Sequence, residues 1–278
     1  MASASTPEHA AALLTLRTPS PPVDGTQTMT DSPLPHWPYP FWIAHRGAGK
    51  LAPENTLAAF RLGTQHGYRM VECDVKLSAD GVPFLLHDAT LPRTTTGQGV
   101  AGELAWEGLS QLDAGSWHSR AFAGEPLPTL AAVARYCQAN GCALNIEIKP
   151  TPGQEADTGR VVALAAQALW SPTLPLPLLT SFQPDSLAAA QAAAPELPRG
   201  LLLDTLWTGW LDAARQLGCR AVVCNHALWD AHTVAQVHAA GMRRISYTVN
   251  DEWAAQRLIA LGTDGIITDR VDLFNPAS

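Results

Sequence analysis

The chain has 278 residues, of which 46% are hydrophobic and 15% are charged, and its formal net charge is -7 at pH 7. This composition supports a large buried core, whereas the acidic balance and the lack of a basic block argue against a nucleic-acid partner. No run approaches the ~18 apolar residues of a membrane span, so we also expect no stable membrane association.

The N-terminal residues and the cysteines indicate the compartment. Glu8 and His9 stand where a signal peptide would have its basic region, and the apolar stretch behind them is very short. The cysteine count is odd and no CxxC motif occurs, so we expect free thiols rather than a disulfide frame or a zinc site. Both patterns predict a cytoplasmic protein. The cysteines are Cys73, Cys137, Cys142, Cys219 and Cys224.

The first part of the chain differs from the rest. Residues 18–40 carry seven prolines and show no periodicity, so residues 1–38 are predicted to form a disordered or extended lead-in. Met29 lies inside this segment, and the sequence leaves open whether translation starts there or at Met1. Residues 39–278 are predicted to form the folded part.

From Trp42 onward, short apolar runs alternate with Ala- and Leu-rich helical segments. Helical candidates lie between most of the predicted strands, and examples are residues 55–67, 128–141, 155–170, 185–194 and 252–262. Gly67, Gly141 and Gly262 stand where a left-handed C-terminal cap belongs. The predicted strands are residues 41–45, 70–75, 82–87, 143–148, 176–182, 200–204, 221–225, 244–249 and 265–269.

Nine strands is one too many for a closed eight-stranded barrel, and the run at 82–87 accounts for the excess. Ala79-Asp80-Gly81 joins it to the preceding strand, and so short a turn makes an antiparallel hairpin. The other eight strands, with helices in their connections, predict an α/β fold: a (β/α)8 barrel with an insertion at about residues 82–126 after the second strand. A doubly wound open sheet is the alternative, although no glycine-rich phosphate loop supports it.

Three carboxylates fall at strand ends of the predicted barrel. Glu72 and Asp74 are two residues apart on one strand, so both point to the same face. Glu147 stands at a matching depth on the next barrel strand. Three unpaired carboxylates would repel one another, and a hard divalent cation, Mg²⁺ or Ca²⁺, removes that repulsion. The sequence therefore predicts one bound divalent cation, with solvated strand ends or structural ion pairs as the alternative.

Two histidines frame these acids. His45 ends the first strand and His87 ends the return strand of the hairpin. Imidazoles can serve as base and acid at neutral pH, and each such group typically contributes ~10²–10⁴-fold in rate. Arg46 and Lys149 supply fixed positive charge, which suits an anionic phosphoryl group. The combination predicts metal-assisted cleavage of a phosphate ester.

These residues lie in motifs that follow one another in a specific order. The motifs are His-Arg-Gly, Pro-Glu-Asn-Thr, Glu-Cys-Asp-Val, Asp-Gly-Val-Pro-Phe-Leu-Leu-His-Asp, Asn-Ile-Glu-Ile-Lys-Pro, Thr-Ser-Phe, Tyr-Thr-Val-Asn and Thr-Asp-Gly-Ile-Ile-Thr-Asp. In them the chain resembles the glycerophosphodiester phosphodiesterase family, of the cytoplasmic bacterial type, over about residues 40–272. The resemblance implies a distorted (β/α)8 barrel whose insertion carries a catalytic histidine. It also implies hydrolysis of a glycerophosphodiester to sn-glycerol 3-phosphate and an alcohol.

The resemblance also implies a role for each site residue. Glu72, Asp74 and Glu147 match metal ligands, and His45 and His87 match an acid/base pair. Arg46 and Lys149 match phosphate-binding residues, and Phe182 and Tyr247 match residues on the glycerol or leaving-group side of the pocket. Glu54 is expected to orient Arg46 or His45.

Other hypotheses remain open at this point. An enolase-like metal-dependent barrel enzyme would leave His87 and Arg46 without clear roles. A related phospholipase-type phosphodiesterase would share much of the chemistry, but it would want an apolar membrane-facing loop or a secretion signal. A non-catalytic binding module would be expected to have lost a central residue. The choice between Mg²⁺ and Ca²⁺, the order in which the histidines act, a cyclic intermediate or direct water attack, the head group and the oligomeric state are not decided by the sequence.

Overall fold

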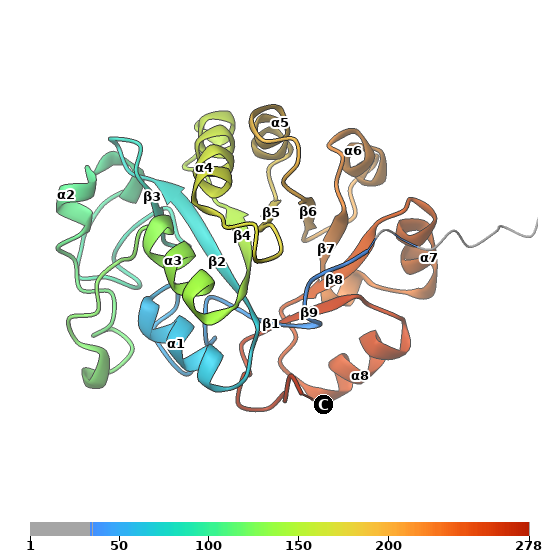
Figure 1. Ribbon diagram of the computed structural model, residues 1–278, viewed down its shortest axis with the longest axis horizontal. Helices are drawn as coiled ribbons and strands as arrows, with labels where there is room; N and C mark the ends of the chain where they lie inside the picture. Colours follow the sequence, from blue (N-terminus) through green and yellow to red (C-terminus); the bar gives the residue numbers. More distant parts are fainter. Residues whose placement is uncertain (1–33, 35, 278) are drawn as a thin grey trace, which may run out of the picture. The chain divides into compact units, whose positions relative to one another are not determined.

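A computed structural model describes residue 34 and residues 36–277. The predicted lead-in at residues 1–38 therefore lies outside the described residues, apart from its last few positions. Eight parallel strands form a ring, which closes because β1 (Trp42–Ala44) pairs with both β2 (Met70–Leu77) and β9 (Gly265–Thr268) (Figure 1). The predicted (β/α)8 barrel is confirmed. The other strands of the ring are β4 (Ala143–Ile148), β5 (Leu178–Ser181), β6 (Arg199–Leu203), β7 (Ala221–Asn225) and β8 (Arg243–Tyr247).

Helices fill the connections between the parallel strands. Side chains of Thr56, Thr129, Asp230 and Asp251 cap four of their N-termini by accepting backbone N–H bonds. None of the helices in the described part of the chain is long and apolar enough to cross a membrane. The helices are α1 (Leu57–Gln65), α3 (Leu130–Asn140), α4 (Glu155–Leu169), α5 (Pro184–Ala193), α6 (Trp210–Gln216), α7 (Ala231–Ala239) and α8 (Glu252–Ala260).

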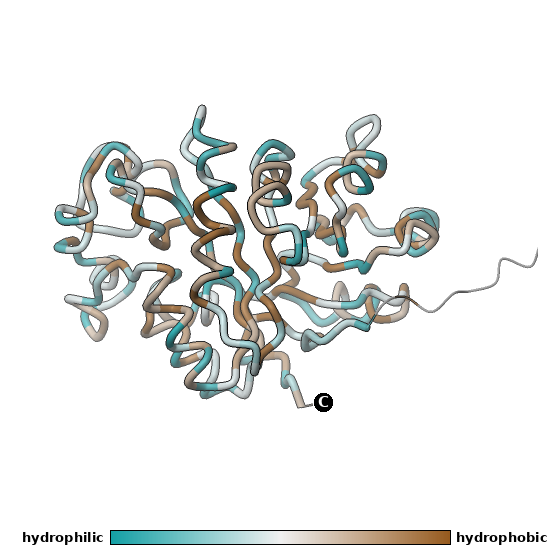
Figure 2. Tube along the Cα trace, turned by 45° about the horizontal axis from the view of Figure 1, so that its top comes forward, coloured by the Kyte–Doolittle hydropathy of each residue, from teal (hydrophilic) through white to brown (hydrophobic). Residues whose placement is uncertain are grey.

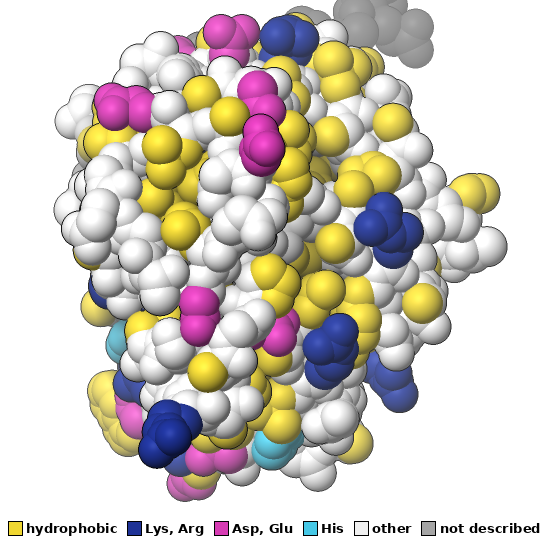
Figure 3. All heavy atoms as spheres, turned by 90° about the vertical axis from the view of Figure 1, so that its left-hand side faces the viewer, with side chains coloured by type: hydrophobic (Ala, Val, Ile, Leu, Met, Phe, Trp, Pro, Cys, Tyr) yellow, Lys and Arg dark blue, Asp and Glu magenta, His cyan; other side chains and the backbone are white. Residues whose placement is uncertain are grey.

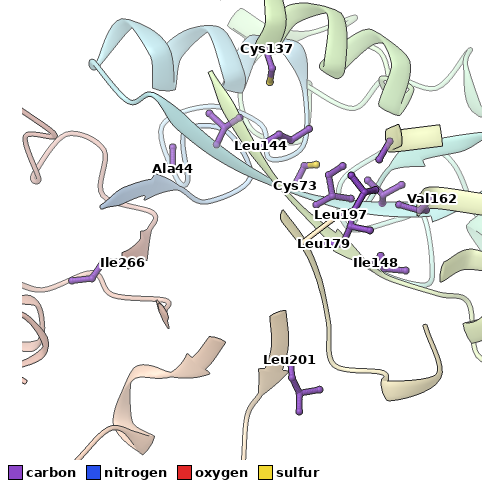
Figure 4. Close-up of a cluster of buried hydrophobic side chains, with 14 of the residues drawn as sticks. Ala44, Cys73, Cys137, Leu144, Ile148, Val162, Leu179, Leu197, Leu201 and Ile266 are labelled. Carbon is purple, nitrogen blue, oxygen red and sulfur yellow. The ribbon is translucent and has the colours of Figure 1, made fainter. Parts of the chain in front are cut away.

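Side chains alternate along the strands between two separate cores. On β2, Val71, Cys73 and Val75 point outward and pack against the helix layer, as Leu144 does on β4. Figure 4 shows part of this outer cluster, and the tube in Figure 2 is brown along the strands that carry it. Met70 on β2 belongs instead to the cluster inside the ring.

An apolar layer fills the inside of the ring at the N-terminal ends of the strands. Trp37, just before β1, packs against this layer, and the hydroxyl of Tyr39, which belongs to the layer, donates to the carbonyl of Leu176 at 2.6 Å. Because the apolar layer occupies the N-terminal part of the ring, the polar side chains that point inward lie at the C-terminal ends of the strands. Active sites of barrel enzymes lie at these ends. The layer itself consists of Tyr39, Ile43, Met70, Ala143, Leu178, Leu202, Ala221, Val223, Ile245 and Ile267.

The insertion after β2 begins with β3 (Pro83–Leu85), which pairs antiparallel to β2 with Val75 opposite Leu85. Gly81 in the connecting turn has φ +80°, so the predicted hairpin is present. The segment that follows packs beside β3 (Figure 1) and contains η1 (Ala101–Glu103), α2 (Trp106–Leu109) and η2 (Arg120–Phe122). Acidic and basic side chains are interspersed over the face on this side (Figure 3). The insertion has a core of its own, formed by Phe84, Leu86, Leu91, Ala101, Leu109, Ala114 and Leu127.

Candidate active site

The three predicted acids meet at the mouth of the barrel. The register of β2 against β4 places Asp74 beside Glu147, with Glu72 one inward-facing position earlier. One carboxylate oxygen from each residue lies within 4.8 Å of the other two. All three residues are buried, with exposed fractions of 3% for Glu72, 1% for Asp74 and 9% for Glu147. The acids therefore form one compact cluster, as the strand alternation predicts.

The electrostatics of this cluster fit a cation. Burial, followed by repulsion from Asp74, raises the pKa of both Glu72 and Glu147 above the usual range of a glutamate. Burial also opposes ionisation of Asp74, but Arg46 and Lys149 outweigh it and lower the pKa of Asp74. The Oδ1 atom of Asp74 is buried without a hydrogen-bond partner. Carboxylate oxygens of this kind are ligands that Mg²⁺ and Ca²⁺ prefer, so the residues present suit a divalent cation.

The loop from β1 to α1 wraps around the acids in a strained conformation. Arg46 has φ +50°, and its backbone N–H donates to Oε2 of Glu72 at 2.9 Å. Asn55 has φ +58°, and its side chain both donates to Oδ2 of Asp74 at 2.8 Å and accepts from the Asp74 N–H at 3.0 Å. Left-handed backbone is uncommon outside glycine and persists where the surrounding contacts enforce it. Here those contacts hold the carboxylates in place.

Gly47 lets this loop lie directly on α1. Its φ is +100°, and an added Cβ would come within 2.8 Å of backbone atoms of Ala59 and Phe60. A side chain at this position would push His45 and Arg46 away from the strand ends. The glycine of the His-Arg-Gly motif is therefore required by both backbone angle and space.

His45 contacts Asp269, an acid to which the sequence alone assigned no role. Its Nδ1 lies 2.6 Å from Oδ1 of Asp269, at the end of β9, and its Nε2 lies 3.9 Å from Oε2 of Glu72. Asn250 fixes Asp269 in turn, because its side chain donates to Oδ2 and accepts from the Asp269 N–H. Burial opposes ionisation of Asp269, but the hydrogen bonds from His45 and Asn250 and the charge of Arg46 together outweigh it and lower the pKa of Asp269. Since an ionised Asp269 can only accept, His45 carries its proton on Nδ1 and presents Nε2 to the cavity.

His87 reaches the same cavity from the insertion. Its Nδ1 lies 2.7 Å from Oδ1 of Asp88, and the guanidinium of Arg93 bonds to both Asp88 and Glu54. Glu54 also accepts from Arg46 at 2.8 Å, so an ion-pair chain runs from the insertion to the β1 loop. Burial lowers the pKa of His87. Of the two partners predicted for Glu54, Arg46 is the one it contacts among the described residues.

The remaining predicted residues line the cavity around the acids, which has a volume of about 200 Å³. Lys149 donates to Oε1 of Glu147 at 2.7 Å, and its Nζ lies 5.4 Å from the centre of the Phe182 ring. The rings of Phe182 and Tyr247 meet edge to face with centroids 5.7 Å apart. His45, Arg46, His87 and the two aromatic residues all face this space. The structure thus brings every predicted site residue to the cavity or to a residue that lines it.

Several residues of the site were not assigned in advance. Asp269 ends a predicted strand and Asn55 lies in the Pro-Glu-Asn-Thr motif, so both carried a signal that strand ends or motif position could have revealed. Arg93 lies in an irregular part of the insertion without periodicity. Lys76 is 2% exposed on the inner face of β2, and burial lowers its pKa to about 8.

Comparison with known proteins places the chain. The family model of the glycerophosphoryl diester phosphodiesterase family matches residues 45–273. The chain belongs to this family. The predicted family and enzyme class are confirmed.

Relatives and solved structures agree with this assignment. The glycerophosphodiester phosphodiesterase of Caldanaerobacter subterraneus is 33% identical over 234 residues, which is 82% of this chain and 93% of that protein. A phosphodiesterase from Oleispira antarctica, solved in complex with the product sn-glycerol-3-phosphate, is 36% identical with a TM-score of 0.79, covering 83% of this chain and 93% of that one. A glycerophosphodiester phosphodiesterase from Agrobacterium tumefaciens is 30% identical with a TM-score of 0.72, covering 86% of this chain and all (100%) of that one.

Proposed function

We propose that this enzyme hydrolyses glycerophosphodiesters to sn-glycerol 3-phosphate and an alcohol in a reaction that depends on one divalent cation, Mg²⁺ or Ca²⁺. The observation that carries the proposal is the convergence of Glu72, Asp74 and Glu147 between two imidazoles, with Oδ1 of Asp74 buried and without a hydrogen-bond partner. The Oleispira antarctica relative was solved with sn-glycerol-3-phosphate, which supports the same product here.

Glu72, Asp74 and Glu147 are the proposed ligands. When bound, the cation would polarise the phosphoryl oxygens as a Lewis acid and offset the charge of the acids. The side chains of Arg46 and Lys149 already lie beside these acids, with Arg46 Nε 3.2 Å and Lys149 Nζ 3.8 Å from oxygens of Asp74. We assign them to the non-bridging phosphoryl oxygens, whose negative charge they would stabilise.

His45 and His87 are the proposed acid/base pair. One accepts a proton from the oxygen that attacks phosphorus, and the other donates a proton to the oxygen of the departing alcohol. Each is anchored through Nδ1 to an aspartate, Asp269 or Asp88, so that Nε2 is left for the substrate. Phe182 and Tyr247 offer an apolar wall for the carbon atoms of the substrate.

The test is to incubate the purified enzyme with glycerophosphocholine, glycerophosphoethanolamine and glycerophosphoglycerol, with a divalent cation or with EDTA, and to measure glycerol 3-phosphate. We expect product only with the cation. His45→Ala and His87→Ala should each lose at least ~10²-fold in kcat while keeping the wild-type circular dichroism spectrum. Failure to release glycerol 3-phosphate from any of the three substrates with either cation would refute the proposal.

A further inference from the structure

A second cavity adjoins the first on the side of the insertion. It has a volume of about 460 Å³, and we call it the side cavity. His87, Glu147, Lys149 and Phe182 line both cavities, whereas His45 lines only the smaller one of the two. The shared residues include the proposed phosphate-binding lysine and one proposed metal ligand. The phosphoryl group would therefore lie at the junction, with one cavity on each side of it.

A phosphodiester has two ester arms that diverge from phosphorus. All substrates of the proposed reaction share the compact glycerol arm, and they differ in the other alcohol. The smaller cavity, with its aromatic wall, fits the constant arm. The larger side cavity fits the variable arm, and His87 faces it in a position to protonate the departing oxygen.

Lys76 gives the side cavity a specific chemistry. Its side chain points inward from β2, lines the side cavity and is 2% exposed. Its Nζ donates to the carbonyl of Lys149 at 3.1 Å. An ammonium has three donors, and no other hydrogen-bond partner of Nζ exists among the described residues. Buried donors are normally satisfied, so two N–H groups are available for an oxygen in the cavity.

The rim adds polar groups and lacks an aromatic cage. Glu155 accepts a hydrogen bond from the N–H of Gly153 through Oε1 only. The side-chain amide of Gln183 is exposed and makes no hydrogen bond within residues 36–277. Quaternary ammonium groups are typically bound by several aromatic faces. Besides His87, Phe182 is the one aromatic residue that lines the side cavity, and Lys149 already lies near its ring.

We propose that the side cavity holds the leaving alcohol and that Lys76 selects alcohols carrying hydroxyl or carboxylate oxygens, such as glycerol or serine, over choline. This inference rests on the proposed function. Lys76 contacts the substrate's leaving arm through its two remaining N–H groups, and Gln183 contributes a further donor and acceptor at the rim.

The experiment compares kcat/KM for glycerophosphoglycerol and glycerophosphocholine. The wild-type enzyme should prefer glycerophosphoglycerol by at least ~10-fold. Lys76→Met should lower kcat/KM for glycerophosphoglycerol by about 10- to 100-fold, the usual worth of a hydrogen bond to a charged group, and affect glycerophosphocholine far less. Gln183→Ala, which removes an exposed side chain, should reduce the same preference by ~2- to 10-fold. The exposed lysine variant Lys50→Met is the matched control and should keep the wild-type ratio.

The outcomes separate this inference from the proposed function. If the wild-type enzyme cleaves both substrates but prefers glycerophosphocholine, the proposed selectivity of the side cavity is wrong. It is also wrong if Lys76→Met loses equally on both substrates, which would make Lys76 a structural residue. If Lys76→Met does not fold, the wild-type preference and Gln183→Ala decide. No cleavage of any glycerophosphodiester would instead refute the proposed function.

Discussion

Nδ1 of His45 and Oδ1 of Asp269 lie 2.6 Å apart and join the first strand of the barrel to the last. The contact fixes which ring nitrogen of His45 carries the proton, and it depends on the closure of the ring. The proton transfer that we propose at Nε2 of His45 would therefore rely on Asp269, a residue that does not itself take part in the reaction.

Asp269→Asn tests this positioning role. The amide keeps the shape of the carboxylate but can offer its N–H to Nδ1, which would favour the wrong tautomer of His45. We expect kcat to fall by ~10²-fold or more, with a changed pH profile of kcat and a nearly unchanged melting temperature. Asp272→Asn, which removes only an exposed pair with Arg270, is the control and should keep wild-type turnover. Turnover of Asp269→Asn within twofold of wild type would dismiss the role.

Glu72→Gln tests the metal site. Replacing Glu72 removes a charge and one of the three proposed ligands, so the affinity for Mg²⁺ or Ca²⁺ should fall by at least ~100-fold. Even changes beside metal ligands commonly cost 10–100-fold in affinity. Calorimetric titration of the purified protein measures this without reference to activity. The exposed acid variant Glu107→Gln should bind the ion as the wild type does. An unchanged titration in Glu72→Gln would mean that the ion binds elsewhere.

The stability of the metal-free protein should fall as pH rises. Burial, then repulsion from Asp74, raises the pKa of Glu147 to about 7. The pKa of Glu147 is thus higher in the folded protein than in the unfolded chain, where it is ~4.3. The contribution of Glu147 to the stability of the fold is therefore complete below pH ~4.3 and is lost as pH rises through about 7. A cation bound at the proposed site would favour the ionised acids and reverse this loss of stability.

The measurement is the difference in melting temperature between protein with a divalent cation and protein with EDTA. We expect it to widen as pH rises from ~5.5 to ~8. Glu147→Gln lacks the titrating group, so its melting temperature with EDTA should vary less over this range. A difference for the wild type that stays constant or narrows with rising pH would contradict the expectation.

Gly47→Ala should destabilise the fold more than Gly81→Ala. Both glycines have positive φ, which costs another residue ~1–2 kcal/mol. Only at Gly47 would the new Cβ also collide with backbone atoms of α1, which adds ~1–3 kcal/mol. Chemical denaturation measures the two free energies of unfolding. Equal losses would show that α1 moves away without cost.

The sequence was informative where periodicity and strand ends coincide. Alternation along β2 and β4 placed Glu72, Asp74 and Glu147 on one face, and the short turn at Gly81 distinguished β3 from the eight strands of the barrel. Contacts that depend on the three-dimensional path of loops carry no such signal. Arg93 reaches Glu54 across 39 residues, and Asp269 reaches His45 across 224.

Two helices of the barrel, α6 and α7, were not among the named helical candidates. The same limit applies to α6, which has seven residues and begins after Gly209 without a side-chain cap. Its place is set by Trp210, which is buried in the outer core. Tertiary packing therefore determines this helix more than its own sequence does.

Closure of the ring also protects this enzyme against aggregation through strand edges. Strands in a closed ring have no unpaired edge through which a second sheet could grow. Among the described strands, β3 alone has a side that faces away from the ring. It is three residues long, Phe84 is bridged there to Thr129, and the Leu85 N–H donates to the carbonyl of Pro128. The folded enzyme therefore exposes little unpaired strand edge among its described residues. We expect aggregation by strand pairing to require that the insertion first unfolds.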